Sequence, residues 1–351
     1  MFSADLKLPE GAVLLHIGPH KTGTTAIQGA MRKARKKMRK HDVVYAGKTR
    51  QHQMAALAVT GGKGLLGDRP AERKDWDDLV SEVRGTRDKR VIVSSEFFDG
   101  ADDDVARMVV DELGGDRVHV VVTLRPLAKI LPSAWQQYVR NRLRHPYDEW
   151  LDAMFNQPPY ELPTVTFWQR HHHDILVERW VKIVGPERLL VIVVDESDPD
   201  SLMRTFEKIT ELPDGLLEPE TGWTNRSLTA AETELIRLLN IEFHKRKWPS
   251  ERYHHAVRRG VVRQIQLRPA SRDEPRIATP AWAIERANEI AAAAAARIEA
   301  TGAHILGDLG SLSKVRADPD ATIIAAPPMT LAGAVSAVEG ALDAAVLTWR
   351  P

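Results

Sequence analysis

The sequence predicts an α/β fold in which a mostly parallel sheet is flanked by helices. Two observations lead to this prediction. First, four short runs rich in β-branched residues have turns or charges on either side, as buried parallel strands do; they cover residues 12–17, 90–94, 117–124 and 188–194. Second, helical stretches lie between these runs, and strands that alternate with helices favour a parallel sheet covered on both faces.

The helical stretches follow the strands in order. They are expected over residues 25–40, 76–86 and 102–113, and the last of them ends before the glycine pair Gly114 and Gly115. Ligands of open parallel sheets bind beyond the carboxyl ends of the strands. The residues directly after each strand are therefore the candidates for chemistry.

Beyond Pro213 the strand-like runs give way to helical periodicity. Ser227 or Thr229 is suited to cap the first helix of this part, because a side-chain oxygen there accepts a backbone N–H bond. The expected helices cover about 227–247, 280–300 and 330–347.

No internal repeat and no linker forces a domain boundary. Hydrophobic residues make up 43% of the 351 residues, which is enough for a sizeable core. We therefore expect a single domain over residues 1–351. Its α/β core spans 12–213, and extra C-terminal helices over 214–351 pack onto the sheet.

Charge and composition exclude several classes of site and partner. Lys and Arg number 49 against 48 Asp and Glu, so the net charge of +1 gives no overall attraction to nucleic acid, and no such partner is expected. Cysteine is absent, which excludes disulfides, thiolate metal sites and a cysteine nucleophile. No run approaches the ~20 apolar residues of a membrane-spanning helix. We expect a cytoplasmic protein without an integral membrane segment, and its oligomeric state stays open.

The first expected strand runs into a glycine-containing turn and a helix start, LHIGPHKTGTTAI over residues 15–27. This arrangement aims backbone N–H groups and the positive helix end at one point, where an anion binds. The candidate ligands are His20, Lys21, Thr22, Gly23, Thr24 and Thr25. The spacing of Gly18 and Gly23 is that of a nucleotide-triphosphate loop, but Thr24 stands where that loop has its lysine. The alternative is an ordinary turn whose glycines and threonines serve packing and capping.

A second candidate anion site follows the third expected strand. Arg125 stands at the carboxyl end of that strand, and Ser133 follows eight residues later on a helix or its entry. A guanidinium fork and a hydroxyl suit a phosphate separate from the first. The alternative is that Arg125 pairs with a surface carboxylate and Ser133 caps a helix.

These pieces together resemble the sulfotransferases that use 3′-phosphoadenosine 5′-phosphosulfate (PAPS), in particular a bacterial branch of that family. The matching segments are PHKTGTT at 19–25, VIVSSEFF at 91–98, and Arg125 with Ser133; a further match, TNRSL, lies at 224–228. The resemblance covers roughly residues 12–140.

The resemblance implies a single α/β domain similar to P-loop nucleotide kinases, with PAPS as the donor and no metal. It implies that Lys21 and the loop bind the 5′-phosphosulfate, with Thr24 and Thr25 on the phosphate. Arg125 and Ser133 would then bind the 3′-phosphate, which is the group that distinguishes PAPS from ATP.

Transfer of a sulfuryl group to a hydroxyl or amine needs a base for the acceptor proton. Glu96 follows the second expected strand and faces the same crevice, and related glycan enzymes use a glutamate near such a position. His20 is the rival base, because the phenol and steroid enzymes of the family use a histidine. The alternative for Glu96 is a capping or ion-pairing role.

Three other patterns suggest a nucleic-acid site, a metal site and an ATPase site, but each lacks a feature that such a site needs. The basic run at 32–40 lacks the interleaved aromatic residues of a nucleic-acid site. Adjacent histidines at 171–173 diverge on a helix and cannot share one metal ion. Asp195 ends an apolar strand, as the magnesium-binding acid of an ATPase does, but the loop lacks the lysine that would accompany it.

The sequence therefore favours a PAPS-dependent sulfotransferase whose catalytic residues are Lys21, Glu96 and His20. The alternatives are an ATP-dependent kinase of small molecules and an inactive nucleotide-binding protein. The acceptor is a small molecule, glycan or lipid, with a carbohydrate slightly favoured over a phenol. We expect it to contact residues 51–67 and 147–169 and the C-terminal helices.

Overall fold

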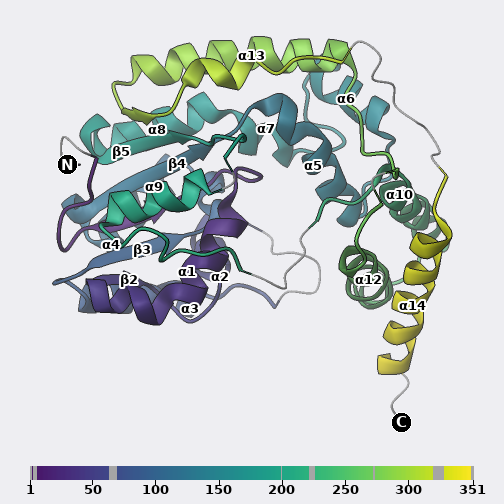
Figure 1. Cartoon of the computed structure of the whole chain (residues 1–351), viewed down its shortest axis with the longest axis horizontal. Helices are drawn as coiled ribbons and strands as arrows, with labels where there is room; N and C mark the ends of the chain where they lie inside the picture. Colours follow the sequence, from purple (N-terminus) through teal and green to yellow (C-terminus); the bar gives the residue numbers. More distant parts are fainter. Residues whose placement is uncertain are drawn as a thin grey trace.

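The computed structural model describes residues 2, 6–62, 69–198, 200–220, 226–271, 273–318 and 328–348. Within these residues, six strands form one sheet in the order β2-β3-β1-β4-β5-β6, and every neighbouring pair is parallel. The strands are β1 (Val13–His16), β2 (Val43–Tyr45), β3 (Arg90–Ser94), β4 (Val118–Leu124), β5 (Leu189–Val193) and β6 (His304–Leu306). The expected α/β fold with a parallel sheet between helices is confirmed (Figure 1).

The α-helices that were expected from periodicity all form, within a few residues of their expected ends. They are α1 (Thr24–Met38), α3 (Arg73–Gly85), α4 (Asp103–Leu113), α10 (Ala230–Lys245), α13 (Ala281–Ala300) and α14 (Leu331–Thr348). Thr229 rather than Ser227 caps α10, because its hydroxyl accepts from the backbone N–H of Glu232.

Further helices complete the chain. They are α2 (Gln53–Thr60), α5 (Leu127–Arg140), α6 (Tyr147–Asn156), α7 (Thr166–His171), α8 (His173–Val184), α9 (Ser201–Thr210), α11 (Ser250–Tyr253) and α12 (Arg263–Leu267). Short 3₁₀ segments are η1 (Arg39–His41), η2 (Glu96–Gly100), η3 (Gly115–Arg117), η4 (Pro186–Arg188) and η6 (Leu309–Ser313), and η5 (His254–Val262) is a π-helix.

Side chains that alternate along the strands fill two cores, one on each face of the sheet. Leu14 of β1 packs with Ile27 of α1 and Phe206 of α9 in one of them. Leu15 points to the other face, where Trp180 of α8 and residues of α3 and α4 lie. This period of two places helices on both faces, as a buried parallel sheet requires.

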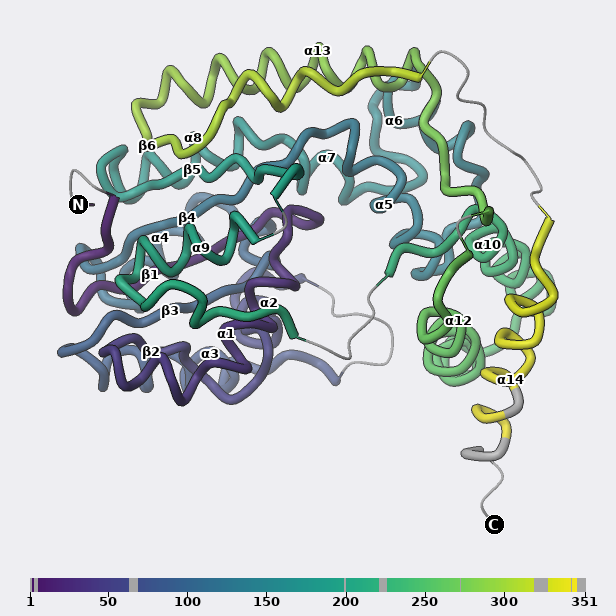
Figure 2. The backbone as a smooth tube through the Cα atoms, in the orientation of Figure 1, coloured from purple at the N-terminus to yellow at the C-terminus, as the bar shows by residue number. Residues whose placement is uncertain are grey.

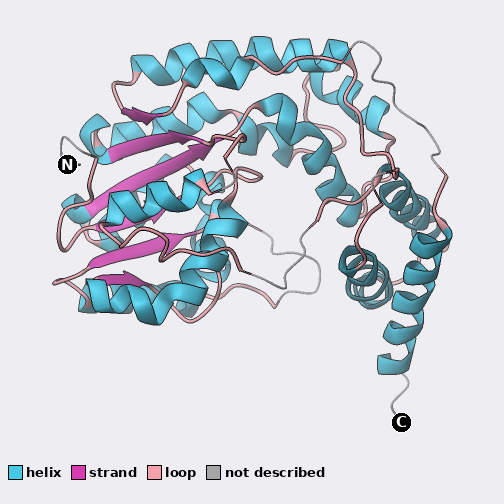
Figure 3. Cartoon of the chain, in the orientation of Figure 1, coloured by secondary structure: helices cyan, strands magenta, loops and turns pink. Residues whose placement is uncertain are grey.

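A third core lies away from the sheet, among helices. It joins α5 and α6 to α10 and η5, with Trp150 and Tyr253 as its largest fully buried side chains. Figure 3 shows that the strands lie at one end of the molecule and that the other end is helical. The expectation that the C-terminal helices pack onto the sheet therefore holds for α13, whose Ala291 and Ile298 join the sheet core, but not for α10.

Helix α13 links the two ends of the molecule. Figure 2 traces it from the region of α6 back to β6 and α8, and it contacts α5, α6 and α8. Among the described helices, none is long and apolar enough to cross a membrane.

Candidate active site

A cavity of about 920 Å³ lies at the carboxyl ends of β1 and β3, between the sheet and the helical end of the molecule. The β1–α1 loop, η2 and α5 line it, together with parts of η5 and α12. Its position is the one expected of a ligand site in a parallel sheet, and its size lies within the range of ligand pockets, about 300–1,000 Å³. Most of the loop residues singled out from the sequence meet here: His20, Lys21, Gly23, Thr24 and Thr25.

Backbone conformation shapes the loop between β1 and α1. Gly23 has φ of 92°, and Lys21 has φ of 70°, a left-handed conformation that side-chain-bearing residues seldom adopt. Gly18 has φ of 86°, and a Cβ atom there would lie 2.9 Å from Cβ of Glu96. Glycine at position 18 is therefore what lets η2 approach the loop and bring Glu96 to the cavity.

A buried hydrogen-bond network lies beneath the loop. The Thr22 hydroxyl donates to the carbonyl oxygen of Pro19 (2.7 Å) and lies 2.8 Å from the hydroxyl of Thr123. The His16 ring bridges Ser94 (2.9 Å) and Thr123 (3.2 Å), and burial lowers the pKa of this histidine to about 3. The Thr22 side chain is thus turned away from the cavity and secures the loop from below.

Lys21 is the half-buried cation at the centre of the loop. Within the described residues, its ammonium group has neither a hydrogen bond nor an ion pair. Its pKa is lowered to about 7, mainly by burial and in part by nearby Arg140, while Glu96 acts in the opposite sense. A buried ammonium group without a partner gains most from a bound anion, because the anion replaces the hydration that burial removed.

The two candidate bases are Glu96 of η2 and His20, which precedes Lys21 in the loop. Glu96 is the first residue of η2, and the buried Gln28 of α1 donates a hydrogen bond to its Oε2 atom (3.2 Å). His20 is buried, its Nε2 lies 3.5 Å from Oδ2 of Asp99, and burial lowers its pKa. Both candidate bases therefore border the cavity that holds Lys21.

The structure separates the second pair of candidates. Ser133 lies inside α5, lines the cavity and donates to the carbonyl oxygen of Ile130 (2.9 Å), so it is not a helix cap. Arg125 pairs with Glu196 and lines a different, small cavity beside His173. Arg125 and Ser133 are thus not brought together in one cavity.

The cavity is also lined by polar residues that were not singled out from the sequence. Gln136, Gln137 and Arg140 follow Ser133 at helical spacing, on the face of α5 that it shares. In the part of the chain that is described, Arg140 has no hydrogen bond or ion pair, and burial lowers its pKa. Arg140 could have been found from the sequence if residues 127–140 had been recognised as an amphipathic helix, because Arg140 then lies on the same helix face as Ser133.

Two sequence segments are described only in part. Of TNRSL, residues 224 and 225 lie outside the described residues, whereas Arg226, Ser227 and Leu228 line the cavity. Of the segment 51–67, residues 63–67 lie outside them, and Gln51 and Gln53 line the cavity. Arg50 borders it as well and donates to the carbonyl oxygen of Thr25 (3.1 Å).

The patterns that pointed to other chemistry lie apart from the cavity. Asp195 accepts hydrogen bonds from the backbone and hydroxyl of Ser197 and borders a separate pocket beside α9. From the basic run, Arg32 pairs with Glu220 and Lys33 with Glu218. A search of the described residues finds no group of three or more His, Asp or Glu side chains that could hold a metal ion.

Comparisons with known proteins give one similarity. No protein-family model matches the sequence, and no curated protein matches it. Among solved structures, the chain is similar to the crystal structure of a sulfotransferase from Alicyclobacillus acidocaldarius. The two share 17% identity over 65% of this chain and 92% of that chain, with a TM-score of 0.43.

Proposed function

We propose that this protein is a PAPS-dependent sulfotransferase that transfers a sulfuryl group to a hydroxyl or amine of a small molecule, glycan or lipid. The observation that carries the proposal is the half-buried Lys21, which has no hydrogen bond or ion pair among the described residues and shares one cavity with Thr24, Thr25 and Glu96. A cation, two hydroxyl donors and a carboxylate base in one cavity are what such a transfer needs.

The loop supplies the site for the 5′-phosphosulfate. Thr24 and Thr25 stand at the start of α1, so their backbone N–H groups and the positive helix end point toward the same place as Lys21. PAPS supplies an activated sulfuryl group with a phosphate leaving group. Lys21 neutralises the charge that builds on this phosphate during transfer.

A second anion site on α5 holds the 3′-phosphate. Ser133 supplies a hydroxyl, and Arg140 supplies a cation from two turns further along the same helix face. Arg125, which the motif resemblance assigns to this phosphate, contributes when its ion pair with Glu196 opens.

Glu96 acts as the base in this proposal. The hydrogen bond from Gln28 holds one carboxylate oxygen, which leaves the other free for the acceptor's proton. His20 is the rival, and its neutral ring also has the capacity to accept a proton. The walls of the cavity come from the sheet end and the helical end together, which supports treating the whole chain as one functional domain.

The geometry argues against an ATP-dependent kinase. The acid that would bind magnesium, Asp195, borders a different pocket from Lys21. In a nucleotide-triphosphate site, that acid and the loop lysine serve the same phosphates. The separation of the two residues favours the sulfotransferase.

Calorimetry with adenosine 3′,5′-bisphosphate and with ADP tests the proposal. We expect the bisphosphate to bind at least tenfold more tightly, and turnover of PAPS in an acceptor screen to survive EDTA. Equal affinity for the two nucleotides, or activity that returns only with Mg²⁺, would overturn the proposal and favour a kinase. Tight bisphosphate binding with no product 80 mass units heavier from any acceptor would indicate an inactive nucleotide-binding protein.

A further inference from the structure

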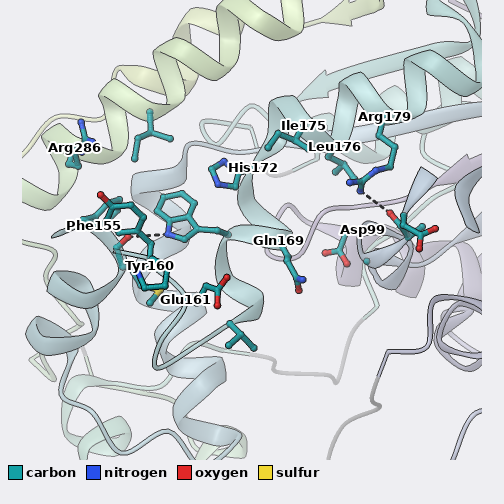
Figure 4. A pocket seen from close by; sticks show the side chains of 18 residues that line it. Asp99, Phe155, Tyr160, Glu161, Gln169, His172, Ile175, Leu176, Arg179 and Arg286 are labelled. Carbon is teal, nitrogen blue, oxygen red and sulfur yellow. Dashed lines mark hydrogen bonds between the residues drawn. The ribbon is translucent and has the colours of Figure 1, made fainter. Parts of the chain in front are cut away.

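A second cavity, of about 630 Å³, borders the other part of η2. Glu96 and Phe97 line the cavity of the candidate active site, whereas Asp99 and Gly100 of the same 3₁₀ segment line this one. Its walls come from α6, α7, α8 and α13. Figure 4 shows Phe155 on one side of this pocket and Leu176 on the other.

The walls of this pocket are mainly apolar. They include Met154, Phe155, Val165, Trp168, Ile175 and Leu176. Trp168 is fixed in place, because its indole N–H donates to the carbonyl oxygen of Met154 (3.0 Å). At the rim, Tyr160, Val165 and Ile175 are 40%, 56% and 46% exposed. Large apolar side chains that stay exposed around an apolar hollow mark a binding site for an apolar group.

Two arginines and the acidic residues Asp102 and Glu161 also line the pocket, and the arginines are already paired. Arg179 pairs with Asp103 (2.9 Å) and donates to the carbonyl oxygen of Ala101 (2.8 Å). Arg286 pairs with Glu289 (2.7 Å). Because both arginines are already engaged, neither is free to bind an anionic ligand.

The inner end of the pocket is polar and points toward the active-site loop. Asp99 is 5% exposed, and its Oδ2 atom has no hydrogen-bond partner among the described residues. The nearest cationic or imidazole nitrogen is Nε2 of His20, at 3.5 Å, which is also unpartnered. His20 in turn borders the cavity of Lys21, so these two side chains stand between the two cavities.

The polar end can hydrogen-bond to a hydroxyl group. Burial raises the pKa of Asp99, although nearby Arg170 acts in the opposite sense, and burial lowers the pKa of His20. The carboxyl group of Asp99 can accept a hydrogen bond from an alcohol whether or not it carries a proton.

We propose that this pocket binds the apolar body of the sulfuryl acceptor, which is an alcohol, and that the alcohol's hydroxyl group lies against Asp99, at the end of the pocket that η2 shares with the cavity of Lys21 and Glu96. That the bound alcohol is a sulfuryl acceptor rests on the proposed function, whereas the existence of the binding site rests on the geometry of the pocket alone. A carbohydrate fits less well, because its ring hydroxyls would lie unpaired against Phe155, Ile175 and Leu176. The pocket therefore reverses the slight preference for a carbohydrate that the sequence suggested.

Calorimetry with 2-naphthol, 2-methoxynaphthalene and methyl β-glucoside tests the site. We expect 2-naphthol to bind at least tenfold more tightly than the glucoside, and severalfold more tightly than the methyl ether, which has no hydroxyl to donate. Asp99→Ala should remove the difference between the naphthol and its ether. Ile175→Glu should weaken naphthol binding at least tenfold, because it places a carboxylate at the rim.

Leu238→Glu is the matched control for Ile175→Glu. Leu238 is 48% exposed on α10 and borders none of the pockets described above, so the same change there should leave naphthol affinity unaltered. Ile175→Glu and Leu238→Glu should keep wild-type affinity for adenosine 3′,5′-bisphosphate within about twofold.

The outcomes separate this inference from the proposed function. If the bisphosphate binds and 2-naphthol binds no better than the glucoside, the pocket assignment is wrong and the donor site stands. An Ile175→Glu protein with unchanged naphthol affinity would also overturn it. If naphthol binds as expected but the bisphosphate does not bind, the alcohol site stands and the sulfotransferase proposal fails.

Discussion

Gln28 of α1 donates a hydrogen bond to Oε2 of Glu96 (3.2 Å) and another to the hydroxyl of Ser94 (3.1 Å). Gln28 is 1% exposed, so its amide has no water to replace these partners. The helix that begins at the anion-binding loop thus also positions the carboxylate at the end of β3. This contact ties the donor side of the cavity to its candidate base.

Gln28→Leu should remove the hydrogen bond that links α1 to the carboxylate of Glu96. The change removes the hydrogen bonds that Gln28 donates to Ser94 and to one oxygen of Glu96, so the free energy of unfolding should fall by about 1–3 kcal/mol, as measured by urea denaturation. The rate of sulfuryl transfer should fall as well, because the carboxylate loses its fixed orientation. Gln28→Glu is the informative companion: a second carboxylate beside Glu96 should shift the acid limb of the pH–rate profile upward. An unchanged profile in Gln28→Glu would mean that Glu96 is not the base.

Lys21 makes nucleotide binding depend on pH. In the free protein its pKa is about 7, and a bound phosphate would raise that pKa because it stabilises the ammonium form. At pH 8, binding of adenosine 3′,5′-bisphosphate should therefore take up a proton, and affinity should fall as the pH rises above 7, by up to about tenfold per unit. Calorimetry in two buffers with different ionisation enthalpies measures the uptake.

Lys21→Met is the control for this linkage. It should lower bisphosphate affinity by about 10- to 100-fold, since a charge-assisted contact contributes roughly 1.5–3 kcal/mol. It should also abolish the proton uptake at pH 8. Proton uptake that persists in Lys21→Met would assign the linkage to another group.

Arg140 and Arg125 are the two candidate cations for binding the 3′-phosphate. If Arg140 holds it beside Ser133, Arg140→Ala should reduce the preference for the bisphosphate over ADP at least tenfold, and Arg125→Ala should reduce it less. Calorimetry of both variants with both nucleotides decides the matter. The opposite ranking would show that the pair between Arg125 and Glu196 opens when nucleotide binds, as the motif resemblance requires.

Glu96→Gln tests the base directly. The amide keeps the shape of the side chain but cannot accept the acceptor's proton, so kcat should fall roughly 10²- to 10⁴-fold. Bisphosphate affinity should stay within about threefold. His20→Asn should cost much less, and a reversal of the two effects would make His20 the base. An unfolded Glu96→Gln protein, seen by circular dichroism, would make the residue structural.

Gly18→Ala tests the close approach of η2 to the loop. A Cβ atom at position 18 would lie 2.9 Å from Cβ and 3.0 Å from Cα of Glu96, so the variant should lose about 1–3 kcal/mol beyond the cost of its positive φ. Gly61→Ala is the matched control, because Gly61 also has a positive φ (66°) but no atom within 4 Å of the added Cβ. Equal losses in the two variants, measured by thermal unfolding, would show that η2 is free to move away.

The sequence by itself determined the parallel sheet and the glycine-containing loop between β1 and α1. Strands β1, β3, β4 and β5 were predictable because each is a mainly apolar run of buried residues. The loop was predictable because its glycines and lysine are local signals. The three-residue strands β2 and β6 are too short to form a recognisable pattern. They form because each pairs with the edge of a neighbouring strand, β2 with β3 and β6 with β5, and this pairing depends on the tertiary structure.

The tertiary structure alone decided which side chains share the cavity. Arg140 joins Ser133 because α5 is a helix at that point, whereas Arg125, only eight residues before Ser133, turns toward Glu196. The contacts of Gln28 with Glu96, and of His20 with Asp99, join residues that are 68 and 79 positions apart. Such pairs depend on how α1 and η2 pack at the end of the sheet, and no local pattern encodes that packing. The sequence thus predicts the kinds of groups at the site, and folding determines which of them meet.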